Sequence, residues 1–210
     1  GFDLNRFQEN YDEKRKNFRI NYNLKDDEIA VGIVGRLVPV KNHSFFLEAI
    51  KFLKDNSRNK IHAFIVGDGE ERANLETQTG QLGISDMVTF TSWIKEVDKI
   101  YPGLDIVCLT SFNEGTPVSL IEAQAANKPI VSTRVGGIEN VVIPDKTALL
   151  SEITEQEQFC KNLLLLTEND DLRISLSIEG WNYVKDKYHF TRLIREVSTL
   201  YSTLLKSPIS

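Results

Sequence analysis

The chain has 210 residues, of which 41% are hydrophobic and 26% are charged, and 25 basic against 30 acidic residues give a formal net charge of −5. This composition is typical of a globular protein and excludes disordered, collagen-like and disulfide-stapled chains. The acidic balance argues against nucleic acid as a partner, and no apolar run approaches the roughly 18 residues of a membrane span. Cys108 and Cys160 are each expected to be buried structural thiols. Since no signal peptide opens the sequence, we expect a cytoplasmic protein.

The first 27 residues form a leading segment in which residues 8–18 have a helical pattern with interleaved charges. From Glu28 onward, apolar runs rich in β-branched residues alternate with helical patterns. The runs predict six strands, at residues 29–34, 61–66, 88–91, 105–110, 129–133 and 147–150. Helices are expected between them, at residues 41–55, 70–82, 95–101 and 117–127.

Several of the runs lack polar alternation, which is typical of strands buried on both faces of a parallel sheet. The alternation therefore predicts a single Rossmann-like, doubly wound parallel sheet in an α/β domain that includes all of residues 1–210. Residues 152–210 show helical patterns only, at 155–168, 171–188 and 191–206, and are expected to form a C-terminal helical tail.

In an open α/β sheet, ligands bind beyond the carboxyl ends of the strands. The loop after the first predicted strand, residues 35–42, holds Gly35, Arg36 and Lys41. Two cations on one short loop can grip a phosphate, but a surface loop with two solvated cations explains the spacing equally well. The turn after the second strand, GDGEER, lacks the third glycine of a dinucleotide fingerprint, so we interpret it as structural.

The stretch after the fourth predicted strand carries the most information. Pro117 suits the first turn of a helix, and Gly115 and Thr116 would leave free amides at its positive end, which is a ready anion site. Glu122 is the only charged residue between Gly115 and Lys128. Its carboxylate either faces solvent or holds ligand hydroxyls in a cleft, because burial without a partner is costly.

Two further loops have open interpretations. Trp93, in TSWIKEVD, either lies beside a nucleobase or belongs to the core. The paired Gly136 and Gly137 after the fifth strand either belong to a site or form an ordinary turn. The histidines are scattered without metal-ligand spacing, so no metal site is expected.

Together these loops resemble the retaining glycosyltransferases of family 4, also called group 1, which have the GT-B architecture. GRLVPVKN, IVGDGEER and VTFTSWI are similar to successive family segments, and residues 105–142 resemble the signature region, with Glu114 and Glu122 as its Glu-x7-Glu pair. Asn42 and Asn127 stand where the family has glycine, and Glu139-Asn140 replaces a frequent Pro-Glu.

The resemblance implies a role for each candidate residue. Arg36 and Lys41 would neutralise a diphosphate leaving group without a metal, and Glu114 would contact the donor sugar. Amides near Gly115, Thr116 and Pro117 would hold a phosphate or a sugar hydroxyl. Gly35 lets the backbone turn tightly and approach the ligand. Glu122 would hold the ribose, and backbone groups at Trp93 and Ile94 would hold the base.

The resemblance further implies that this chain is one half of a GT-B enzyme, the donor-binding domain, with the N-terminal acceptor domain missing. The expected donor is a nucleotide-diphosphate sugar, UDP favoured, and the acceptor a glycan or lipid-linked molecule in cell-surface polysaccharide synthesis. The missing domain could attach the protein to the inner face of the membrane. The isolated domain is expected to be inactive. Two alternatives are a non-catalytic nucleotide-sugar-binding module and a GT-B epimerase or phosphorylase.

Overall fold

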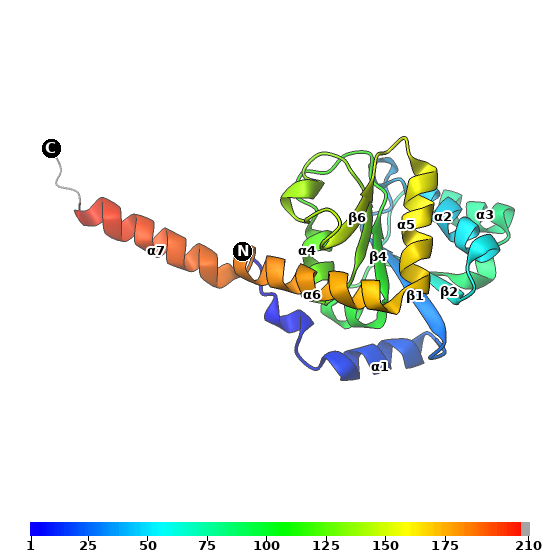
Figure 1. The fold of residues 1–210 in the computed structure, drawn as a ribbon, viewed down its shortest axis with the longest axis horizontal. Helices are drawn as coiled ribbons and strands as arrows, with labels where there is room; N and C mark the ends of the chain where they lie inside the picture. The colour runs from blue at the N-terminus through cyan, green and yellow to red at the C-terminus, as the bar shows by residue number, and fades with distance from the viewer. Residues whose placement is uncertain (207–210) are drawn as a thin grey trace.

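A six-stranded parallel sheet with strand order β3-β2-β1-β4-β5-β6 forms the centre of the molecule (Figure 1). The structure is a computed structural model that describes residues 1–206. The strands are β1 Glu28–Val34, β2 Lys60–Val66, β3 Val88–Phe90, β4 Ile106–Leu109, β5 Ile130–Thr133 and β6 Ala148–Ser151. The predicted doubly wound sheet is confirmed, and its strand order changes direction between β1 and β4.

Helices cover both faces of the sheet, and each face has its own hydrophobic core. The alternation of side chains along β4 shows why: Val107 and Leu109 belong to one core, and Ile106 and Cys108 to the other. The first core is completed by α1 Tyr11–Asn21 and α4 Val118–Ala125, and the second by α2 His43–Asn56, α3 Arg72–Leu82 and α5 Gln156–Glu168. The long α6, Asp170–Lys187, contributes to both cores. The expected buried thiols are confirmed, because Cys108 and Cys160 are both buried and free.

The helix predicted at residues 95–101 is wrong. The structure has two short 3-10 turns there, Val97–Lys99 and Tyr101–Gly103. Pro102 has no amide hydrogen with which to continue a helix. Gly103 also packs tightly on Phe18, since an added Cβ would lie 2.1 Å from the ring.

The two asparagines that replace glycine in the family pattern both adopt left-handed backbone. Asn42 has φ 51° and Asn127 has φ 54°. Asparagine is the non-glycine residue that adopts this conformation most readily. The backbone geometry that a glycine would provide is therefore kept at both positions.

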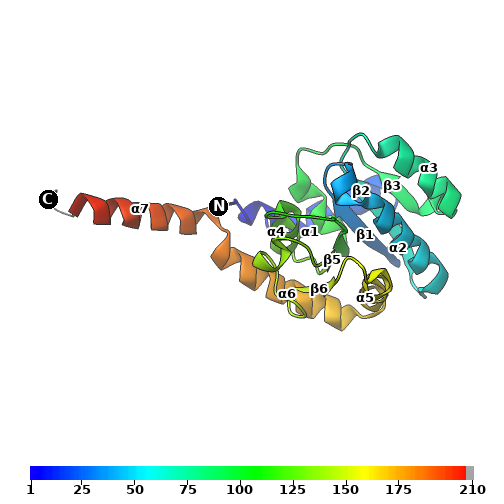
Figure 2. The ribbon, with the colours of Figure 1, turned by 90° about the horizontal axis from the view of Figure 1, so that it is seen from above.

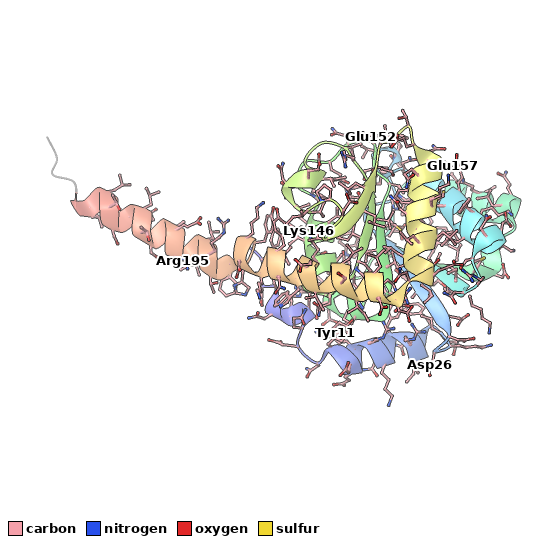
Figure 3. All side chains as sticks on the ribbon, in the orientation of Figure 1. Tyr11, Asp26, Lys146, Glu152, Glu157 and Arg195 are labelled. Atoms are coloured by element: carbon pink, nitrogen blue, oxygen red, sulfur yellow. The ribbon has the colours of Figure 1, made fainter. Side chains whose placement is uncertain are left out.

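The last helix, α7 Phe190–Lys206, projects away from the body (Figures 1 and 2). Arg195, labelled on this helix in Figure 3, lies outside the body. The N-terminus is tied to the start of α7, because the Phe190 amide donates to the Phe2 carbonyl over 3.0 Å. Along α7 large apolar side chains are exposed, at Leu193, Ile194, Val197, Leu200, Tyr201, Leu204 and Leu205. Within residues 1–206, no helix has both the length and the apolar character to cross a bilayer.

Candidate functional site

A cavity of about 510 Å³ lies at the carboxyl ends of the strands. In Figure 3 this edge of the sheet is marked by Glu152, which follows β6, and the opposite edge by Asp26, which precedes β1. The loops after β1, β3 and β4 converge there, at the point where the strand order reverses. Nine of the ten predicted site residues line this cavity: Gly35, Arg36, Lys41, Trp93, Ile94, Glu114, Thr116, Pro117 and Glu122. The tenth, Gly115, is not among the lining residues.

A second cavity of about 540 Å³ lies between α1 and residues 94–100. It shares Ile94 with the first cavity but contains none of the other nine predicted residues. We therefore place the candidate site in the first cavity, which combines the cations, the carboxylates and the start of α4.

The two predicted cations of the β1 loop differ in their surroundings. Arg36 is exposed, and its side chain has no hydrogen-bond or ion-pair partner among the described residues. Lys41 is not a solvated cation, because its Nζ lies 2.5 Å from Glu114 Oε1 and the two side chains are only 23% and 9% exposed. The Ser111 hydroxyl donates to the same Oε1 over 2.6 Å. The ion pair joins the β1 loop to the β4 loop and leaves Arg36 free to meet a ligand.

The GDG turn after β2 packs against the backbone of the β1 loop. A Cβ on Gly67 would lie 2.0 Å from the Gly35 carbonyl oxygen, and one on Gly69 would lie 2.4 Å from the carbonyl oxygen of Leu37. Gly67 also has a backbone φ of 143°, which residues with a side chain rarely adopt. These contacts support the structural interpretation of the turn, although Gly67 also lines the cavity.

The paired glycines after β5 support the β4 loop in the same way. The Gly137 amide donates to the Glu114 carbonyl over 2.8 Å. A Cβ on Gly137 would lie 1.8 Å from the Gly115 carbonyl oxygen, and one on Gly136 would lie 2.1 Å from that of Glu114. The two glycines therefore do more than form a turn, because a side chain at either position would displace the backbone that carries Glu114.

The start of α4 forms another wall of the cavity. Pro117 is the N-cap residue, and no side chain caps the helix. Thr116, Val118 and Ser119 line the cavity. The first amides of a helix carry a partial positive charge and lack partners within the helix, so this end of α4 can bind an anion.

Glu122, one turn further along α4, lines the cavity and is half-buried, which favours the interpretation as a cleft residue. Burial raises the pKa of its carboxyl group, and a hydrogen bond from the Tyr101 hydroxyl, over 3.1 Å, opposes that rise. The carboxylate is a strong acceptor for ligand hydroxyls. The assignment of those hydroxyls to a ribose stays a prediction.

Trp93 is 68% exposed, so the interpretation as a core residue is wrong. Sequence reasoning missed Lys95 and Ser119, which also line the cavity. The position of Lys95 two residues after Trp93 was a usable signal, because the whole TSWIKEVD loop follows β3. Tyr101 gave no signal, since a buried aromatic beside an apolar strand looks like core.

The arrangement favours an anionic ligand with hydroxyl groups. Arg36, Lys41 and Lys95 line one cavity together with the positive end of α4, and Glu122 supplies an acceptor nearby. Within residues 1–206, no group of three or more His, Cys, Asp or Glu side chains is placed to hold a metal ion.

Comparison with known proteins shows the family of this chain. The sequence model of the family "Glycosyl transferases group 1" matches residues 14–181. The UDP-Gal:alpha-D-GlcNAc-diphosphoundecaprenol alpha-1,3-galactosyltransferase of Escherichia coli is 26% identical, over 85% of this chain and 46% of its own length. The D-inositol 3-phosphate glycosyltransferase of Corynebacterium jeikeium is 30% identical, over 84% of this chain and 44% of its own. This chain thus spans about half the length of these relatives.

Solved structures share the fold. Anabaena HepE, crystallised with UDP, superposes with a TM-score of 0.87 at 19% identity, over 97% of this chain and 56% of its own. The C-terminal domain of the group 1 glycosyl transferase LpcC of Francisella tularensis has a TM-score of 0.76 at 24% identity, over 90% of this chain and 99% of its own. Since the family match includes most of the sequence and the fold agrees, the chain belongs to the group 1 glycosyltransferases.

Proposed function

We propose that the chain is the donor-binding half of a retaining glycosyltransferase that takes a nucleotide-diphosphate sugar, with UDP as the favoured nucleotide. The observation that carries the proposal is the convergence of Arg36, Lys41, the start of α4 and Glu122 on one cavity at the point where the strand order reverses. Each of these groups suits one part of such a donor.

The diphosphate is assigned to the positive side of the cavity. Negative charge grows on the leaving diphosphate as the sugar bond breaks, and fixed positive groups placed there stabilise it. Arg36 is free to bind phosphate oxygens in a bidentate manner, and the amides at residues 115, 116, 118 and 119 add the helix dipole. We propose that these groups neutralise the leaving group without a metal ion.

The sugar and the nucleoside are assigned to the two carboxylates and the Trp93 loop. Glu114 Oε1 already accepts from Lys41 and Ser111, while Oε2 has no partner among the described residues and can accept from a sugar hydroxyl. Glu122 would accept from the ribose, and the backbone of Trp93 and Ile94 would hold the base. The glycine at 35 allows the donor to approach the β1 loop.

The names of relatives support UDP and a surface-glycan role. HepE was crystallised with UDP and with UDP-glucose, and the Escherichia coli relative is named for UDP-Gal and a diphosphoundecaprenol acceptor. A further relative, LpsE of Rhizobium meliloti, is named for lipopolysaccharide core biosynthesis. We propose by analogy a glycan or lipid-linked acceptor, bound by the additional half that the relatives possess, at the cytoplasmic side of a membrane.

Calorimetry of the chain with UDP, GDP and ADP in EDTA tests the proposal. We expect a nucleoside diphosphate to bind in EDTA, with UDP the tightest of the three. Binding that requires magnesium or manganese would contradict the metal-free arrangement. Failure of all three nucleotides to bind under either condition would contradict the proposed function itself.

A further inference from the structure

Tyr101 carries a hydroxyl group beside the Glu122 carboxylate that the proposed function does not use. Its ring is fully buried and packs edge-on against Phe7, with centroids 5.8 Å apart. The hydroxyl oxygen lies 3.1 Å from Glu122 Oε2 and 3.2 Å from the Ser119 carbonyl oxygen. A phenol has one proton to donate, and an ionised carboxylate is the stronger acceptor of the two. The hydroxyl therefore bonds preferentially to Glu122.

Glu122 depends on this contact for its position. Among residues 1–206, Tyr101 is the only hydrogen-bond partner of the Glu122 side chain. A glutamate side chain has several rotatable bonds, and one hydrogen bond to a ring fixed in the core removes much of that freedom. Because the bond engages Oε2, the lone pairs of Oε1 stay available for a ligand in the cavity.

We propose that Tyr101 is a positioning residue, whose hydroxyl holds the Glu122 carboxylate in place to accept hydrogen bonds from the ribose hydroxyls of a bound nucleotide. This inference rests on the proposed function, which assigns the ribose to Glu122. Tyr101 itself lines no part of the cavity and acts only through Glu122.

The contact also affects the charge of Glu122. Burial raises the pKa of this carboxyl group, Asp98 adds to the rise, and Tyr101 and Arg6 oppose it. Removing the Tyr101 hydroxyl should therefore raise the pKa of Glu122 further. Since the ribose needs an ionised acceptor, affinity falls as the pH drops through that pKa. The fall should begin at a higher pH when the hydroxyl is absent.

Calorimetry between pH 5 and 8 with UDP and with 2′,3′-dideoxy-UDP tests the inference on the full chain. Tyr101→Phe should weaken UDP binding at pH 7 by about fivefold to tenfold, the scale of one ordinary hydrogen bond. It should leave binding of the dideoxy analogue unchanged, because that probe has no ribose hydroxyl for Glu122 to accept. In a Glu122→Gln background the effect of Tyr101→Phe should disappear.

The pH profile separates positioning from a general structural effect. UDP affinity should fall as the pH is lowered, and Tyr101→Phe should move this fall to higher pH. Titration of the UDP phosphates is common to all variants, so it does not contribute to the difference between them. Tyr101→3-fluorotyrosine keeps the ring and makes the hydroxyl a stronger donor, so it should move the loss to lower pH. Tyr22→Phe is the matched control, since its hydroxyl has no partner among the described residues and lies outside this cavity.

The outcomes separate the positioning role of Tyr101 from the assignment of the ribose to Glu122. If UDP binds to the parent and both Tyr101 variants keep its affinity and pH profile, the positioning role is overturned alone. The same holds if Tyr101→Phe weakens both nucleotides equally. If the parent binds UDP and its dideoxy analogue equally, or Glu122→Gln changes nothing, the assignment of the ribose to Glu122 fails, and the positioning role fails with it.

Discussion

Lys128 is a buried amine whose replacement should change how the stability of the protein depends on pH. It lies just before β5 and is 3% exposed. Its Nζ donates to the Tyr11 hydroxyl over 2.5 Å and to the Pro102 carbonyl over 3.0 Å. Tyr11, labelled in Figure 3, stands at the start of α1. Burial is the main cause that lowers the pKa of Lys128 to about 7; Arg15 and Arg19 act in the same direction, and Asp105 opposes them.

The sign of the effect follows from proton binding in the two states. The ordinary pKa of lysine is about 10.4, so between pH 7 and that value the unfolded chain binds a proton at Lys128 that the folded chain releases. The free energy of unfolding therefore rises with pH by about 1.4 kcal/mol per unit, or about 2–3 kcal/mol between pH 7 and pH 9. Below pH 7 both states bind the proton and this contribution is constant.

Lys128→Met removes the titrating group and keeps most of its volume. Below pH 7 the variant should be more stable than the parent, because it no longer buries a charge. Its advantage should shrink by about 2–3 kcal/mol between pH 7 and pH 9. Urea unfolding followed by circular dichroism at each pH measures this difference. The exposed Lys146→Met is the matched control and should give a constant difference. A constant difference for Lys128→Met would refute the reasoning.

Three further predictions concern binding and activity. Gly137→Ala should abolish most UDP binding, because its Cβ would lie 1.8 Å from a backbone oxygen of the β4 loop, whereas Gly80→Ala in α3 meets nothing closer than 4.0 Å and should leave calorimetric affinity unchanged. Arg36→Ala and Lys41→Ala should each weaken UDP binding by about 1.5–3 kcal/mol. Only Lys41→Ala should also lower the melting temperature, because it removes the ion pair with Glu114. If both variants keep the parent's affinity for UDP, the diphosphate binds elsewhere. Under the proposed function, this chain alone should transfer no sugar in a donor-turnover assay, because a closed cleft would need the additional half that the relatives possess. Robust turnover by this chain alone would contradict that prediction.

The positions of the strands, and of the loops that surround the site, follow from local patterns in the amino-acid sequence. Each strand is a short apolar run, and the pattern within a run depends only on neighbouring residues, so the predicted positions of β1 and β4 agree closely with the structure. Because parallel strands end at one edge, the same pattern placed the loops containing Arg36 and Glu114 side by side. The resemblance to a family, carried by contiguous motifs, was confirmed for the same reason.

Which side chains meet depends on how distant segments of the chain pack together. Lys41 and Glu114 are 73 residues apart in the chain, and Tyr101 and Glu122 are 21 apart, so no local pattern could pair them. The support that Gly137 gives to the β4 loop and the low pKa of Lys128 also arise from contacts between distant segments. At residues 95–101 the local pattern predicted a helix, but the structure has two 3-10 turns instead. Pro102 and the packing against α1 prevent a longer helix there. Burial and electrostatics depend on the distances between atoms in the folded chain, and these distances exist only once the elements have packed.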